Sequence, residues 1–97
     1  MLNITAIKSI DTLSSILAKL TVPHTLNSAL DGMQLRFPWA DGDVIAHSYS
    51  IGWENGMVES YRFPWDKKGD YDDITVDTPE RMAVRIACLY FGIEEEG

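Results

Sequence analysis

The sequence predicts an α+β fold: an antiparallel meander sheet of three to four strands with N- and C-terminal helices packed on it, in the order α-β-β-β-(β)-α. Two segments with helical spacing of apolar residues lie near the two ends, and β-rich runs separated by turn residues lie between them. The tetrapeptide Arg36-Phe37-Pro38-Trp39 also recurs unchanged as Arg62-Phe63-Pro64-Trp65. With 97 residues, 45% of them hydrophobic, the chain can form one domain, 1–97, around a single core.

The N-terminal helix is predicted from an apolar stripe at helical spacing. Residues 1–7 fit either a short strand or the beginning of a helix, and Ser9 suits the N-cap position. The stripe that follows comprises Leu13, Ile16, Leu17 and Leu20. Val22-Pro23 ends this helix, because the residue before a proline disfavours the helical conformation. Thr25–Leu30 is predicted to add one further turn before Asp31-Gly32 breaks it.

Three strands are predicted in the middle of the chain: Met33–Phe37, Val44–Trp53 and Met57–Phe63. Asn55-Gly56 between the second and third strands favours a tight type I′ hairpin, since both central residues need a positive φ. Strands one and three then run in the same direction on either side of strand two. Proline lacks the N–H that a strand ladder needs, so both Phe-Pro-Trp segments should leave the sheet at the same end.

This hairpin pairs Trp53 with Val58 and Tyr49 with Arg62. The apolar residues of the two strands then point to different faces, so either both faces are partly covered or a bulge shifts the register. Arg36 and Arg62 would flank Tyr49, where two guanidinium groups could grip a carboxylate, stack on the ring or simply make a cross-strand contact in solvent.

The end of the chain gives the clearest boundary. Ile74-Thr75-Val76 fits a short fourth strand, Thr78 suits an N-cap, Pro79 the first helical position and Gly92 the C-terminal stop. The apolar stripe of this helix comprises Met82, Ile86, Leu89 and Ile93, of which the first three are predicted to be core.

The segment from Ile74 to Ala83 resembles the strand-turn-helix ending of small phage-encoded proteins of the "phage ABA sandwich" type. The resemblance implies an accessory protein of a mobile element that works inside a host cell and is not an enzyme. It carries over no catalytic residue, because that family has none assigned.

Charge and cysteine content exclude several classes of function. The formal net charge of −7 argues against direct binding of nucleic acid, whose affinity comes from Lys and Arg. The order of elements is that of double-stranded-RNA-binding domains, but Pro79-Glu80 stands where those domains need lysine. A single cysteine, Cys88, fits a reducing compartment. Without a long apolar run or a secretory signal, we expect a cytoplasmic protein that does not span a membrane.

No arrangement for catalysis is apparent. The chain has only two histidines, His24 and His47, and neither is predicted to lie beside Cys88. The aspartates could offer oxygen ligands to Ca²⁺, but their spacing does not match the EF-hand loop. We therefore expect no enzymatic activity and no cofactor or metal.

The predicted recognition surface is the sheet end where the two Phe-Pro-Trp segments emerge. Its candidate residues are Trp39, Asp41, Asp43, Trp65, Asp66, Asp70, Asp72 and Asp73. Exposed tryptophans ringed by carboxylates would suit a protein partner that is basic or binds nucleic acid, and the carboxylates could imitate phosphates as an inhibitor does. The alternatives are a structural or homodimerising domain with no external ligand and, third, a small metal-dependent protein or enzyme.

Overall fold

The computed structural model describes residues 1–66 and 74–94. Its elements, in chain order, are α1 (Ile4–Lys19), β1 (Thr25–Ala29), β2 (Gly32–Phe37), β3 (Ala40–Ala46), the 3-10 helix η1 (Trp53–Asn55), β4 (Val58–Tyr61), β5 (Ile74–Asp77) and α2 (Pro79–Phe91). The five strands form one sheet in sequence order, each antiparallel to the next. The predicted α+β meander with a helix from each end of the chain is confirmed, with one strand more than expected.

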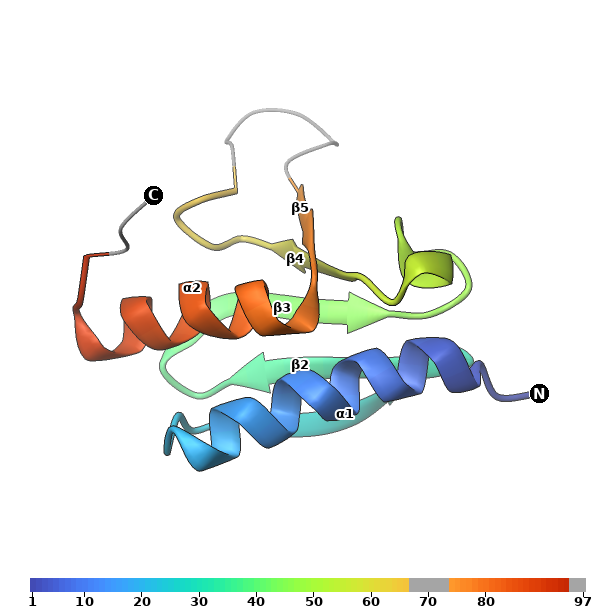
Figure 1. The fold of residues 1–97 in the computed structure, drawn as a ribbon, viewed down its shortest axis with the longest axis horizontal. Coiled ribbons are helices and arrows are strands. Elements are labelled where there is room, and N and C mark those ends of the chain that lie inside the picture. Colours follow the sequence, from blue (N-terminus) through green and yellow to red (C-terminus); the bar gives the residue numbers. More distant parts are fainter. Residues whose placement is uncertain (67–73, 95–97) are drawn as a thin grey trace.

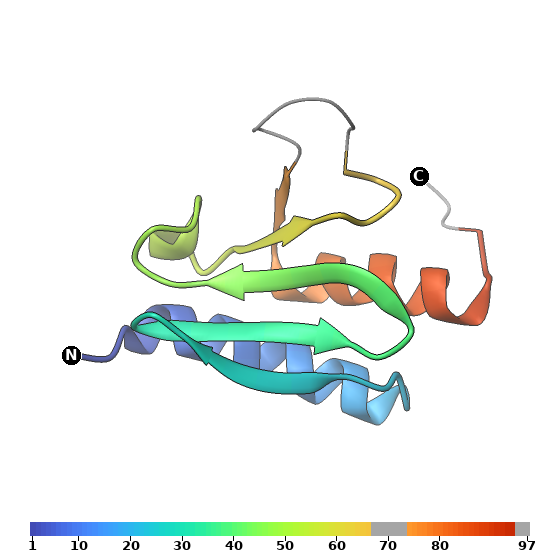
Figure 2. The ribbon, with the colours of Figure 1, turned by 180° about the vertical axis from the view of Figure 1, so that it is seen from behind.

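Both helices lie side by side on one face of the sheet, and no helix formed by the described residues covers the opposite face (Figures 1 and 2). The core lies between these layers because apolar side chains of alternate strand residues face the apolar stripes of the helices. Its fully buried members include Ile10, Leu13 and Leu17 of α1, Leu35, Val44 and Val58 of the strands, and Met82 and Ile86 of α2. None of the helices described is long and apolar enough to cross a membrane.

Helix α1 begins earlier than the sequence predicts. Asn3 is the N-cap, and its side-chain oxygen accepts a hydrogen bond of 3.1 Å from the N–H of Ala6. Ser9 is therefore wrong as the N-cap: it lies inside the helix, where its hydroxyl donates to the carbonyl of Thr5. Asparagine and serine cap equally well, so the choice between them depends on which one the surrounding fold places at the helix end.

The segment after α1 forms a strand and not the predicted further turn of helix. Strand β1 pairs with β2 down to Ala29 opposite Gly32, which leaves Leu30 and Asp31 as a two-residue turn. Leu30 adopts a left-handed conformation with φ of 53°. The carbonyl of Asp31 also accepts a hydrogen bond of 2.7 Å from the N–H of Asn3, so the start of α1 is tied to this turn.

The predicted tight hairpin at Asn55-Gly56 is wrong. Strand β3 ends at Ala46, and the chain reaches β4 through a loop that contains η1 and two left-handed glycines, Gly52 (φ 82°) and Gly56 (φ 72°). The observed register pairs Val44 with Ser60. This register resolves the conflict between the faces, because both of these side chains now point into the core.

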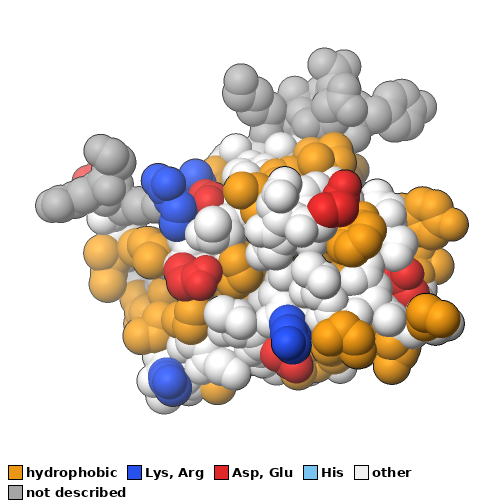
Figure 3. All heavy atoms as spheres, turned by 45° about the vertical axis from the view of Figure 1, so that its right-hand side comes forward, with side chains coloured by type: hydrophobic (Ala, Val, Ile, Leu, Met, Phe, Trp, Pro, Cys, Tyr) orange, Lys and Arg blue, Asp and Glu red, His pale blue; other side chains and the backbone are white. Residues whose placement is uncertain are grey.

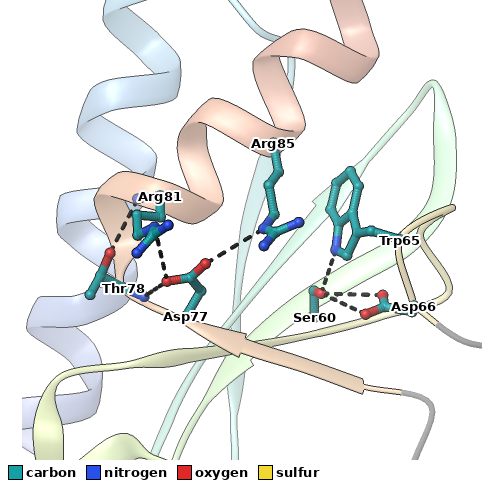
Figure 4. Close-up of polar contacts among 7 residues, drawn as sticks. All are labelled: Ser60, Trp65, Asp66, Asp77, Thr78, Arg81 and Arg85. Atoms are coloured by element: carbon teal, nitrogen blue, oxygen red, sulfur yellow. Dashed lines mark hydrogen bonds and ion pairs between the residues drawn. The ribbon is translucent and has the colours of Figure 1, made fainter. Parts of the chain in front are cut away.

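Helix α2 has the predicted ends. The hydroxyl oxygen of Thr78 accepts a hydrogen bond from the N–H of Arg81, Pro79 follows, and Gly92 ends the helix in a left-handed conformation. At the end of β5, the carboxylate of Asp77 lies 3.8 Å from Nε of Arg81 and 3.5 Å from Nε of Arg85, which ties β5 to the helix (Figure 4). Leu89 is 36% exposed, so its assignment to the core is wrong, whereas Met82 and Ile86 are fully buried as predicted.

Candidate binding groove at the Phe-Pro-Trp turns

The two copies of the repeated tetrapeptide meet at one end of the sheet, as predicted. Strands β2 and β4 flank β3 and run in the same direction, so the turns that follow them lie side by side. The rings of Phe37 and Phe63 pack edge to face with centroids 5.6 Å apart, and Phe63 stacks on Trp65 at 4.6 Å. The repeat therefore forms one aromatic cluster.

A buried hydrogen-bond network fixes the turn after β4. The carboxylate of Asp66, which is 5% exposed, accepts bonds from the hydroxyl of Ser60 (3.1 and 3.2 Å) and the N–H of Phe63 (3.1 Å). The indole N–H of Trp65 donates to the same hydroxyl at 3.0 Å (Figure 4). The expectation that Asp66 belongs to an exposed acidic surface is wrong, since this carboxylate holds the turn from inside.

The network also holds Arg62 in a conformation that its side chain disfavours. Arg62 has a φ of 68°, which costs a residue other than glycine about 1–3 kcal/mol. Its guanidinium carbon lies 5.2 Å from the centre of the Tyr61 ring, within the range of a cation–π contact. The turn therefore presents an exposed guanidinium group in a defined position beside the aromatic cluster.

The turn between β2 and β3 is held by contacts with distant segments. The indole N–H of Trp39 donates to the carbonyl of Pro23 at 2.9 Å, and its ring packs on Tyr90 of α2 with centroids 5.0 Å apart. Phe63 covers Gly42 so closely that a Cβ there would lie 2.7 Å from the phenyl ring. Trp39 is thus only half-buried, with its polar edge satisfied and part of its ring at the surface.

Two adjoining hollows open at this end of the sheet and share Trp39, Ala40, Asp41 and Arg62 in their walls. One has a volume of about 560 Å³ and is completed by Arg36, Phe37, Pro38 and Gly42. The other has a volume of about 530 Å³ and is completed by Phe63, Pro64, Leu89 and Tyr90. We call the residues of the two hollows together the Phe-Pro-Trp groove.

The two halves of the groove differ in chemistry. The first carries both arginines, and the second is mostly apolar and lies at the C-terminal end of α2. Figure 3 shows hydrophobic side chains gathered around that end of the helix, and Leu89, Tyr90 and Phe91 are among the exposed ones. The groove therefore combines a polar, cationic hollow with an apolar one.

Neither arginine of the groove forms an ion pair with a described residue, although Asp41 lines both hollows. Among residues 1–66 and 74–94, the ion pairs are those of Arg81 and Arg85 with Asp77. Asp43 lies opposite Arg36 in the sheet, but its carboxylate accepts a hydrogen bond of 2.5 Å from the side-chain amide of Gln34. Arg36 and Arg62 thus leave two guanidinium groups at the surface of a chain whose net charge is −7.

The other predicted site residues divide into three groups. Asp41 is exposed and lines both hollows, whereas Asp43 lies on the helix-free face of the sheet. Asp70, Asp72 and Asp73 lie outside the described residues. Tyr49, predicted between the two arginines, lies instead in the loop after β3, at the opposite end of the sheet and beside His47.

Sequence reasoning missed the part that α2 contributes to the groove. Leu89 and Tyr90 follow the buried residues of α2 in the same helical stripe. An apolar stripe that continues past the last residue packed on the sheet indicates an exposed apolar surface. The sequence could not show where this happens, because it does not give the length of the sheet.

Glu59 lies near Asp43 on the helix-free face of the sheet, where it is partly buried. Burial raises the pKa of the Glu59 carboxyl above its ordinary 4.5, and the charge of Asp43 raises this pKa further, against a hydrogen bond from the N–H of Ile51 that lowers it. A carboxyl whose pKa is raised in the folded state holds its proton more tightly in the folded protein than in the unfolded chain. The free energy of unfolding therefore falls as the pH rises from the ordinary pKa through the raised one, because the carboxyl must then carry its charge while partly buried.

We expect Glu59→Gln to raise the melting temperature at pH 7, because glutamine keeps an acceptor for Ile51 and carries no charge to bury. The gain should disappear below the ordinary pKa of 4.5, where the glutamate is protonated in both states. Thermal unfolding of both proteins between pH 3 and 8 measures the difference. A gain that is the same at every pH would contradict the assigned cause.

The described residues show no arrangement typical of a reactive centre. Both ring nitrogens of His24 are engaged, one with the hydroxyl of Ser14 (2.8 Å) and one with the carbonyl of Val22 (2.9 Å). Within the same residues, no group of three or more His, Cys, Asp or Glu side chains could hold a metal ion.

No family model matches the chain, and no curated protein or solved structure shows significant similarity to it. The resemblance to small phage proteins therefore stays a prediction.

Proposed function

We propose that this chain is a non-catalytic protein-binding domain and that the Phe-Pro-Trp groove holds an extended segment of its partner. The observation that carries the proposal is the pairing of a cationic hollow with an apolar one across a shared wall that contains Trp39 and Arg62. Tryptophan, tyrosine and arginine are the residues most enriched among the energetically important contacts of protein interfaces.

The chemistry of the groove favours a segment with a carboxylate close to a large apolar side chain. Arg36 and Arg62 can bind a carboxylate through paired hydrogen bonds, which lysine cannot match in geometry. Leu89 and Tyr90 offer apolar surface next to the Trp39 ring. The carboxylate could belong to a side chain or to the end of the partner chain.

The net charge of −7 supports a partner that is basic as a whole, such as a nucleic-acid-binding protein of a host cell that this chain inhibits. Long-range attraction would then speed the encounter, and the groove would supply the short-range contacts. In that case the association rate falls as salt rises, whereas the dissociation rate depends on the groove.

Selection of binders from a random peptide library tests the proposal. We expect the selected sequences to share an acidic residue near a large apolar one. Arg36→Gln should then weaken binding of a selected peptide about tenfold or more, a loss of at least about 1.4 kcal/mol. The matched control is Arg81→Gln, which removes the same charge from an exposed residue on α2 and should leave the affinity unchanged.

Two outcomes would contradict the proposal. Binders rich in lysine and arginine that tolerate Arg36→Gln would place recognition on the acidic surface instead. Binders that lose affinity equally in the Arg36→Gln and Arg81→Gln proteins would show that charge alone is recognised.

A further inference from the structure

Strand β1 forms one edge of the sheet, and its outer side has no neighbouring strand among the described residues. Among the described strands it pairs with β2 alone, and Figure 2 shows it at the lower edge of the sheet. Its first four residues, Thr25 to Ser28, are exposed and Ala29 is half-buried. The backbone N–H and C=O groups on the outer side of β1 are therefore available to pair with another strand.

This edge lacks the usual protection against pairing. Natural proteins guard edge strands with charged side chains, proline or bulges. Residues 20–30 contain no Asp, Glu, Lys or Arg, in a chain that has 8 basic and 15 acidic residues. The one proline nearby, Pro23, lies before the strand, and the pairing of β1 with β2 is regular along its whole length.

Exposed leucines accompany the open edge. Leu26 in the strand is 42% exposed, Leu20 just after α1 is 42% exposed, and Leu30 in the following turn is 71% exposed. A strand that paired with β1 would cover part of this apolar surface, in addition to forming the backbone hydrogen bonds.

We propose that a second copy of this chain pairs with the edge, β1 against β1 in antiparallel orientation, so that two five-stranded sheets become one. A symmetric pair must place each residue opposite its symmetry equivalent. A two-fold axis at Asn27, the centre of β1, meets this condition: Asn27 faces its own copy, Leu26 faces Ser28, and Thr25 faces Ala29.

Charge favours a second copy as the occupant of this edge. Two chains of net charge −7 repel each other. Residues 20–30 carry no Asp, Glu, Lys or Arg, so pairing through this stretch brings no charged side chains of the two copies together. The antiparallel arrangement points the β2 strands of the two copies in opposite directions. The two Phe-Pro-Trp grooves would therefore lie at opposite ends of the joined sheet, and dimer formation does not depend on the proposed function.

A charge swap at Asn27 tests the proposal. The wild-type chain should sediment as a concentration-dependent dimer. Asn27→Lys and Asn27→Glu should each be monomeric, because either change puts two like charges at the axis and a charge on the edge. An equimolar mixture of the two variants should restore the dimer, which also shows that both are folded. The control is Asn55→Lys, the same change at an exposed residue of η1, and should leave the dimer intact.

Three results would overturn the proposal: a wild-type chain that stays monomeric at the highest concentration reached, a dimer that persists in the Asn27→Lys protein, or a mixture of the variants that does not associate. The second result would place the interface elsewhere on the surface. The first would leave the edge to an extended segment of a different protein.

Discussion

Ile86→Ala should lower the free energy of unfolding by about 2–5 kcal/mol, the usual cost of cutting a large aliphatic side chain in a core back to alanine. Ile86 is fully buried and belongs to the main core cluster. The loss combines the transfer free energy of the deleted carbons with the cavity that they leave. Urea unfolding followed by circular dichroism measures it, with m-values compared to confirm two-state behaviour.

Val84→Ala is the matched control for Ile86→Ala. Val84 lies on the same helix, is 51% exposed and should change the stability by no more than about 0.5 kcal/mol. If Ile86→Ala lowers the free energy of unfolding as little as Val84→Ala does, the face of α2 that carries Ile86 is not packed in the core.

Asp66→Ala should destabilise the protein by about 2–6 kcal/mol, since it leaves the Ser60 hydroxyl and the Phe63 N–H buried without their acceptor, at about 1–3 kcal/mol each. The turn that presents Arg62 should loosen with it, so near-ultraviolet circular dichroism of the stacked Phe63 and Trp65 should change as well. The measurements are urea unfolding and the near-ultraviolet spectrum.

Asp41→Ala is the control for Asp66→Ala, because Asp41 is exposed and accepts no hydrogen bond from the described residues. It should leave stability within about 0.5 kcal/mol of the wild type. A loss of stability shared equally by both variants would mean that the buried network does not hold the turn.

The parts of the fold that were predicted correctly follow either from residues adjacent in the chain or from the strand order of a meander. Thr78, Pro79 and Gly92 define α2 because capping depends on residues adjacent in the chain. The two Phe-Pro-Trp turns emerge together because alternate strands of a meander run in the same direction. The same reasoning failed for Asn55-Gly56, where a strong local turn signal is used inside a longer loop whose path depends on Gly52 and on contacts with the rest of the fold.

The candidate site was predicted in part for the same reason. Trp39 and Asp41 lie in the groove because they follow a strand that ends there. Asp66 is buried because its carboxylate accepts bonds from Ser60 and Phe63, and no sequence pattern separates such an aspartate from one in solvent. The contribution of α2 depends on how far a helix extends past a sheet, which is a property of the assembled layers.

The position of a bound peptide in the protein tests the central claim most directly. The three tryptophan indole N–H signals in a nitrogen–proton NMR spectrum serve as reporters. Trp39 lies in the groove, Trp65 stacks on Phe63 of the groove wall, and Trp53 lies in η1 at the opposite end of the sheet. On titration with a selected peptide, the Trp39 indole and the backbone of residues 36–42 and 62–64 should shift, while Trp53 stays unchanged. Shifts at Trp53 and in the loop after β3, with Trp39 unmoved, would contradict the claim that the Phe-Pro-Trp groove is the binding surface.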